Sequence, residues 1–314
     1  MVKISTILIM FGLALFLASC DSGYYTATGE DGVTGTDGVK MDFIPGTTPS
    51  KVMEDEEYSM QLRIENKGAV DIAEGYLDFS FEKQMFELEN QDDIKEFALS
   101  GDDGAFRGED KVTEVKMRTK DTRMQNVDQT STTIKINACY EYGTRFEGTM
   151  CIDTNINSDA SSKPCTMSSI SGGQGQGAPV VIDQVDSRAT TGSDGINFNF
   201  DIYVRNAASG TVLRPGSSER ICTSELASED FGVIDISEIA LSKYRLSEGS
   251  ITCQSHTDSP NQFDLSHQRD YISCRITEEV PYDLGTFSTP ISIRLDYGYL
   301  QSIEKDLTVL SRYD

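Results

Sequence analysis

Cysteines are the residues of this 314-residue chain with the plainest chemistry, since seven of them stand beside only two histidines. Six lie beyond residue 130, and an even set in an exported chain indicates disulfide bonds. A zinc site would need close pairs such as Cys-x-x-Cys with histidine partners, and neither pattern occurs. We therefore predict three disulfides among Cys139, Cys151, Cys165, Cys222, Cys253 and Cys274.

The pairing of these six cysteines is open among fifteen combinations, and spacing favours one pair. Cys139 and Cys151 lie symmetrically about Arg145, in a turn-like stretch, so a hairpin there would place them opposite each other. Three cysteines come before residue 167 and three after it. An odd number in each half requires at least one bridge between the halves, and we predict Cys165 as its member.

Carboxylates and histidines are the other candidates for chemistry. An acidic run occupies residues 54–57, and Asp102 and Asp103 lie in a glycine-rich stretch. Calcium prefers several carboxylate and carbonyl oxygens, but the twelve-residue calcium-loop pattern is missing. His256 and His267 share a polar stretch without a third ligand nearby. We expect no metal and no cofactor, and name Asp102 and Asp103 as the candidates should calcium bind.

Signatures of the common enzyme classes are missing from the sequence: there is no Gly-x-Ser-x-Gly elbow, phosphate loop or His-Glu-x-x-His helix. Paired carboxylates hydrolyse glycosides when held about 5–10 Å apart. The 51 acidic residues, however, single out no pair. Tyr282, Tyr297 and Tyr299 are available for ligand contacts, although strand positions favour the core or its rim. We expect a protein that is not an enzyme.

The charge excludes one class of partner. Lys and Arg number 27 and Asp and Glu number 51, which gives a formal net charge of −24. Such a surface repels phosphate backbones, so we expect no nucleic acid. With 38% hydrophobic and 9% aromatic residues the chain has enough apolar material for a packed core.

The N-terminus predicts export. Lys3 precedes an apolar run at residues 4–17, and small residues follow. As a helix this run is roughly 21 Å long, short of the roughly 30 Å bilayer core. The segment Leu17-Ala18-Ser19-Cys20 resembles the lipobox of prokaryotic lipoproteins. That resemblance implies removal of residues 1–19 and a lipid on Cys20; the alternative is an ordinary signal peptide with a chance cysteine.

Alternating apolar residues predict strands through the rest of the chain. The clearest run from residue 60 to 64, 77 to 81, 196 to 204 and 291 to 299. Residues 223–231 are predicted as a short helix. Long amphipathic helices do not alternate with strands, which disfavours a parallel α/β fold.

Two stretches are read as connections from their composition. Residues 20–40 carry glycine at every third position over part of their length, which predicts a flexible tether. Residues 167–177 are rich in Ser, Gly and Gln and predict a linker. The sequence thus indicates an all-β protein with antiparallel β-sandwich domains at residues 41–166 and 178–314.

A family resemblance refines this fold. Residues 52–81 resemble the start of a CARDB-type immunoglobulin-like domain, in which a strand ends in Asn-x-Gly, here Asn66 and Gly68. Asn206 and Gly210 form a looser counterpart in the second half. The wider arrangement is similar to uncharacterised envelope proteins of archaea. These resemblances imply immunoglobulin-like sandwiches and a surface location.

The sequence therefore predicts a non-catalytic protein that a lipid anchors on the extracytoplasmic face of a cell membrane. Its expected work is binding or scaffolding, with the membrane as its partner through the lipid and other envelope proteins as further candidate partners. An envelope hydrolase that uses carboxylates or a metal is one alternative. A subunit of a larger surface or transport assembly is the other.

Overall fold

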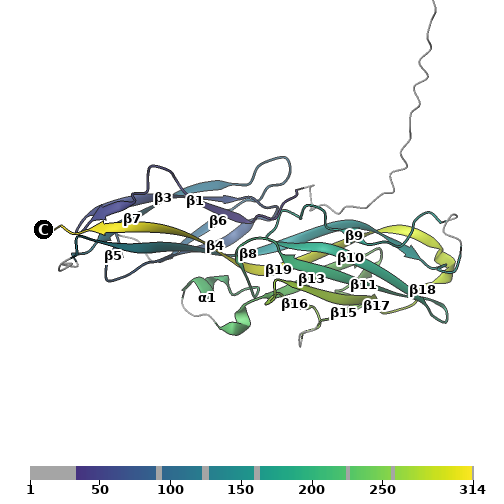
Figure 1. Ribbon diagram of the computed structural model, residues 1–314. Coiled ribbons are helices and arrows are strands. Elements are labelled where there is room, and N and C mark those ends of the chain that lie inside the picture. Colours follow the sequence, from purple (N-terminus) through teal and green to yellow (C-terminus); the bar gives the residue numbers. More distant parts are fainter. Residues whose placement is uncertain are drawn as a thin grey trace, which may run out of the picture.

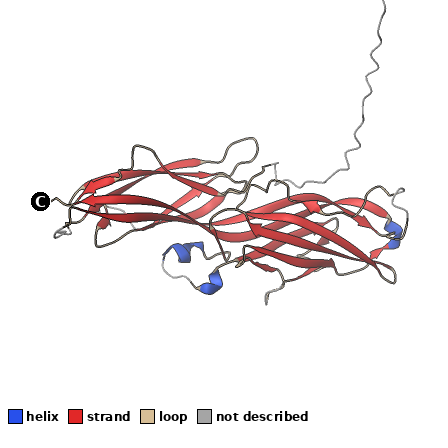
Figure 2. Ribbon diagram, viewed as in Figure 1, coloured by secondary structure: helices blue, strands red, loops and turns tan. Residues whose placement is uncertain are grey.

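The computed structural model describes residues 33–89, 94–121, 127–158, 163–223, 227–255 and 259–312. Almost all regular structure in these ranges is antiparallel β-sheet, so the all-β prediction is confirmed (Figure 2). The signal peptide, Cys20 and His256 lie outside the described residues. Within them, no helix has the length and apolar content needed to cross a membrane.

The described residues form three sheets. The four-stranded sheet lies in the first half of the chain and the six-stranded sheet in the second. The four-stranded sheet has the order β1 (Val39–Phe43), β3 (Glu57–Asn66), β7 (Asp110–Thr119), β5 (Phe86–Leu88). The six-stranded sheet has the order β15 (Ile251–Gln254), β17 (Arg269–Ile276), β11 (Gly195–Asn206), β10 (Val180–Thr191), β9 (Ile170–Ser171), with β18 (Val280–Pro281) beside β11.

The third sheet has nine strands and runs through both halves. Its central order is β14 (Tyr244–Arg245), β13 (Val233–Leu241), β19 (Thr286–Leu310), β8 (Gln129–Asp153), β4 (Ile72–Ser80), β6 (Ile94–Leu99). The short strands β12 (Thr211–Leu213), β16 (Gln262–Asp264) and β2 (Lys51–Met53) complete it. In the described ranges, the helical segments are α1 (Ser218–Thr223) and 3-10 turns at Ser228–Asp230 and Tyr282–Leu284 (η4).

The long strands β8 and β19 join the two halves. They pair antiparallel over 25 residues each, from Gln129 opposite Leu310 to Asp153 opposite Thr286, and they run along the molecule in Figure 1. β19 borders β13 in one half, and in the other its last residues pair with β2. One continuous core from Val39 to Val309 fills the space between the sheets.

Several predictions about connections are wrong. Residues 141–148 form no hairpin, because they belong to the unbroken β8. Residues 33–38 are packed rather than tethered: Gly35 donates to the carbonyl of Gln174, and Gly177 donates back to Gly35. The predicted linker contains β9, and five of its eleven residues are buried. The predicted boundary at residues 167–177 therefore does not coincide with a break in the nine-stranded sheet.

Four tyrosines mark the centre of the molecule. They lie in facing pairs on β8 and β19, and all are buried, as the sequence predicted for Tyr297 and Tyr299. Each hydroxyl accepts a hydrogen bond from a backbone N–H, over 2.9–3.4 Å. The four pairs are Tyr140 with Val39, Tyr142 with Val70, Tyr297 with Val180 and Tyr299 with Gly210.

This hydrogen-bond pattern repeats between the halves. Asn66 ends β3 opposite Val39, and Asn206 ends β11 opposite Val180. The side-chain amide of Asn66 donates to the carbonyl of Val70, and that of Asn206 donates to Gly210. The strand ends that the sequence predicted at these asparagines are confirmed. β8 in one half thus takes the place that β19 takes in the other.

Candidate functional site

The three disulfides are all formed, but the favoured pairing is wrong. Cys139 pairs with Cys222, Cys151 with Cys165, and Cys253 with Cys274. Cys139 and Cys151 lie twelve residues apart on the single strand β8, which is roughly 40 Å. They therefore cannot meet. Three disulfides are typical of chains that fold in an oxidising compartment outside the cytoplasm.

A bridge between the two halves exists, as the odd cysteine counts require, but its member is not Cys165. Cys139 of β8 binds Cys222 of α1, across 83 residues. The Glu141 carboxylate accepts hydrogen bonds from the N–H groups of Gly216 and Ser218, at 2.9 and 3.2 Å. The disulfide and this carboxylate hold α1 on the sheet face opposite the tyrosines. A small apolar cluster around Ile221 buries the bridge. Of the short helix predicted at residues 223–231, the structure shows the last residue of α1 and the 3-10 turn Ser228–Asp230, and residues 224–226 lie outside the described ranges.

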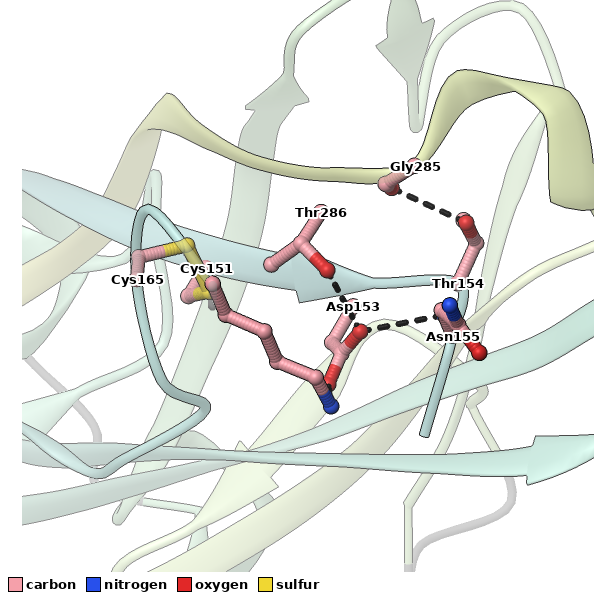
Figure 3. The surroundings of a disulfide bond; sticks show 8 residues. Cys151, Asp153, Thr154, Asn155, Cys165, Gly285 and Thr286 are labelled. Carbon is pink, nitrogen blue, oxygen red and sulfur yellow. Dashed lines mark hydrogen bonds and ion pairs between the residues drawn. A yellow bond between two sulfur atoms is a disulfide. The ribbon is translucent and has the colours of Figure 1, made fainter. Parts of the chain in front are cut away.

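The Cys151–Cys165 bridge lies beside a buried ion pair, and we call this cross-linked region the base (Figure 3). Asp153 lies two residues after Cys151, and Lys163 lies two residues before Cys165. Their charged groups pair at 2.5 Å, and each side chain is only 8% exposed. The Asp153 carboxylate also accepts hydrogen bonds from the Thr286 hydroxyl and the Asn155 N–H, at 2.7 and 3.0 Å. The ion pair and the disulfide therefore fix the same loop.

These contacts set the charge state of Asp153. Partial burial acts to raise the pKa of its carboxyl. Hydrogen bonds from Lys163, Thr286 and the Asn155 N–H outweigh burial, so the pKa lies below its ordinary value. The group is a carboxylate at neutral pH, and it holds Lys163 as its counter-ion.

The base carries an exposed tip. The Thr154 hydroxyl donates to the Gly285 carbonyl at 2.9 Å (Figure 3) and to the Tyr282 carbonyl at 3.1 Å, and thereby holds η4 in place. The Tyr282 hydroxyl in turn donates to the Gly192 carbonyl of the β10–β11 hairpin, at 2.9 Å. Tyr282 is nevertheless 42% exposed, and Leu284 is 48% exposed. An aromatic and an aliphatic side chain are thus presented to solvent on a fixed support.

Carboxylates surround this apolar pair. Glu279 accepts hydrogen bonds from the N–H groups of Ser193 and Asp194, at 3.1 and 2.7 Å. Those backbone hydrogen bonds lower the pKa of Glu279, so it stays ionised. Asp194, Glu278 and Asp283 are exposed on the same loops. We call Tyr282, Leu284, Asp194, Glu278 and Asp283 together the distal tip.

The calcium and histidine candidates are not brought together with the tip. Asp103 accepts hydrogen bonds from the N–H groups of Ala105 and Phe106, and Asp102 accepts one from Gly104. Both carboxylates therefore shape their own loop, and His267 is exposed elsewhere. Among the described residues no group of three or more His, Cys, Asp or Glu side chains is placed to hold a metal ion.

The sequence singles out no pair of carboxylates for hydrolysis. The structure brings acidic side chains together in two regions. A groove beside the molecule's centre is lined by Arg145, which faces Arg294 across β8 and β19, and by acids including Asp71 and Asp296. Elsewhere, a side-chain hydrogen bond with Glu57 raises the pKa of the Glu89 carboxyl. That pair lies on the outer surface of the four-stranded sheet, beside Arg118, rather than in a cleft.

Comparison with known proteins adds little to this geometry. No protein-family model matches the chain, and no curated protein matches it. A solved structure, the serine-rich repeat adhesion glycoprotein Srr1 from Streptococcus agalactiae, is similar over 87% of this chain and 97% of that one. The sequence identity is 10% and the TM-score is 0.20, too low to carry an argument about function.

Proposed function

We propose that this chain is a non-catalytic, lipid-anchored protein on the extracytoplasmic face of a cell membrane, which binds another envelope protein through the distal tip. The observation that carries the proposal is the exposure of Tyr282 and Leu284 on η4, which hydrogen bonds from Thr154 hold beside the Cys151–Cys165 disulfide and the buried ion pair. Rigid aromatic anchors lose little conformational entropy on binding.

The charge of the tip indicates the chemistry of the partner. Asp194, Glu278 and Asp283 surround the apolar pair and are exposed. An interface with an apolar centre and an acidic rim fits a partner surface with an apolar pocket and basic rim. We therefore expect binding to weaken as salt concentration rises.

Capture from detergent-solubilised membranes of the source cells tests the binding. The full chain serves as bait, and the double variant Tyr282→Ala/Leu284→Ala is expected to lose one specific protein that the wild type retains. Phe106→Ala/Val112→Ala is the matched control, because it removes an exposed aromatic and an exposed aliphatic side chain from the other half. Equal capture by both variants, or capture of no specific protein, contradicts the proposal.

Cell fractionation tests the anchor separately. Cys20→Ser is expected to move the protein from the membrane fraction to the soluble fraction, because it removes the thiol to which the lipid would be attached. A wild-type protein that is already soluble contradicts lipidation. A subunit of a larger assembly remains the second candidate, and it is favoured if the tip captures several proteins in fixed proportions.

A further inference from the structure

The outer face of the six-stranded sheet carries a second surface, which contains two stacked tyrosines. Tyr203 on β11 lies directly opposite Tyr271 on β17. Their ring centroids are 5.5 Å apart, and the ring planes differ by 23°. The neighbouring Ile202 and Ile272 are fully buried in the core, so the tyrosines point outward. Tyr271 is 40% exposed, and its ring is backed by that of Tyr203.

Two arginines lie beside this stack. Arg205 and Arg269 are the next outward residues of the same two strands, and they too are directly opposite each other, about 7 Å along the strands from the tyrosines. Like charges in directly opposed positions destabilise a sheet unless a counter-charge is present. Arg205 has one in Asp183, at 2.6 Å, and Arg269 is exposed. We call these four residues the tyrosine–arginine array.

The charge of this face is the reverse of the chain's. On the outward positions of β10, β11 and β17 there are four arginines and three aspartates: Arg188, Arg205, Arg269 and Arg275 against Asp183, Asp186 and Asp201. The whole chain has 27 basic and 51 acidic residues. This face therefore carries a local excess of one positive charge, whereas the chain as a whole is strongly negative, and Arg269 and Arg275 are its arginines outside the two ion pairs with Asp183 and Asp201.

The neighbours of the array are held in place. The buried carboxylate of Asp201 pairs with Arg188 at 2.8 Å and accepts a hydrogen bond from Ser273 at 2.7 Å. Two ion pairs and a ring stack thus fix the side chains on rigid strands. Such a surface meets a ligand without first having to be ordered.

We propose that the tyrosine–arginine array binds an acidic sugar chain of the uronic-acid type. The exposed face of Tyr271 stacks on the apolar face of a sugar ring, and the guanidinium groups of Arg269 and Arg205 bind the ring carboxylate. A neutral sugar satisfies only the tyrosines, and an acidic peptide satisfies only the arginines. The proposal goes beyond the distal tip, which lies on other residues and takes a partner of opposite charge.

Calorimetric titration of the full chain with oligogalacturonate tests the proposal. Tyr271→Ala and Arg269→Gln are each expected to weaken binding at least about tenfold, which corresponds to about 1.4 kcal/mol. Tyr271→Phe keeps the ring and is expected to stay within about twofold. Arg63→Gln is the matched control, since Arg63 is an exposed strand arginine on the other half, 54% exposed.

Two comparison ligands sharpen the outcome. A neutral maltooligosaccharide and a polyglutamate of equal charge are both expected to bind at least about tenfold more weakly than oligogalacturonate. Absence of oligogalacturonate binding, equal binding of polyglutamate, or an equal loss in Arg63→Gln overturns the proposal. Unfolding curves of each variant confirm that the loss is not one of folding. The variant Tyr282→Ala/Leu284→Ala retains full sugar affinity if the array acts independently of the tip.

Discussion

Tyr140 and Tyr297 hold equivalent positions in the two halves, because each hydroxyl accepts a hydrogen bond from the first residue of a strand in the opposing layer. Tyr140 binds the N–H of Val39 at 3.1 Å, and Tyr297 binds that of Val180 at 3.4 Å. Burial raises the pKa of both hydroxyls well above the ordinary value, so they stay neutral. The two contacts connect the nine-stranded sheet to each of the other sheets.

Removing either hydroxyl is expected to destabilise the protein measurably. Tyr140→Phe and Tyr297→Phe each leave a buried N–H without its partner, which costs about 1–3 kcal/mol of unfolding free energy. Urea denaturation checks this. Tyr282→Phe is the control, since its hydroxyl is at an exposed site, and it is expected to change stability by less than about 0.5 kcal/mol. Equal effects at all three positions would count against the structural role of the pair.

The bridge between the halves is expected to contribute more than the others. Cys139 and Cys222 close a loop of 83 residues, whereas Cys151 and Cys165 close one of 14. Loop entropy gives about 4.5 kcal/mol for the first and about 3 kcal/mol for the second. The double variants Cys139→Ser/Cys222→Ser and Cys151→Ser/Cys165→Ser, compared by denaturant midpoint, check the order. A larger loss from the shorter loop would reverse the expectation.

The buried ion pair is expected to show a defined pH dependence. Asp153→Asn leaves Lys163 buried without its counter-ion, which costs about 3 kcal/mol at neutral pH. Because the folded-state pKa of Asp153 is lowered, this stabilisation is present above the unfolded value of about 3.9 and is lost as pH falls through the folded value. Urea denaturation should therefore show nearly the same difference between variant and wild type at pH 7 and pH 4.5, and a smaller difference at pH 3.

A matched pair on the surface serves as the control for this prediction. Lys40 and Asp42 form an ion pair whose side chains are 54% and 56% exposed. Asp42→Asn is expected to cost under about 1 kcal/mol at every pH, because solvent screens exposed pairs. If both Asp→Asn variants behave alike, burial does not set the strength of the Asp153 pair.

Close packing at Gly68 gives a fourth prediction. A Cβ there would lie 2.0 Å from the Tyr142 hydroxyl and 2.3 Å from the Gly177 carbonyl. Gly68→Ala is therefore expected to cost at least about 3 kcal/mol, as an overpacked core does at the upper end. Gly46→Ala is the comparison, because Gly46 has a φ of 81° and no atom within 4 Å of the added group. It should cost only about 1–2 kcal/mol of backbone strain, measured by the same denaturation curves.

The strands were predictable, because one buried face imposes an alternation that the sequence displays directly. The connections between strands were not predictable, because glycine is found both in turns and at places where two backbones approach closely. In β8, a Cβ at Gly143 would lie 3.0 Å from the Leu295 carbonyl, so this glycine permits strands to approach and makes no turn. Gly172 does the same in the predicted linker, where a Cβ would lie 1.8 Å from the Ile182 carbonyl.

The candidate sites were less predictable than the fold. Cysteine parity predicted a bridge between halves, but only the register of β8 shows that its member is Cys139. Tyr282 was named from its residue type alone. Tyr203 and Tyr271 were missed, since their meeting depends on the pairing of β11 with β17 across 68 residues. The alternation of polar and apolar residues in β11 was a signal for the outward position of Tyr203, but not for its partner.

The pairing of β8 with β19 along their whole length has a consequence for how the gene can evolve. The first half of the chain needs β19 from the second half as a partner for β8 and β2. Neither half can therefore be moved into another gene as a unit that folds alone. A chain cut at residue 166 loses β19, which pairs with β8 along its whole length, and both halves are left with an open edge. The gene is therefore expected to be inherited as one indivisible unit.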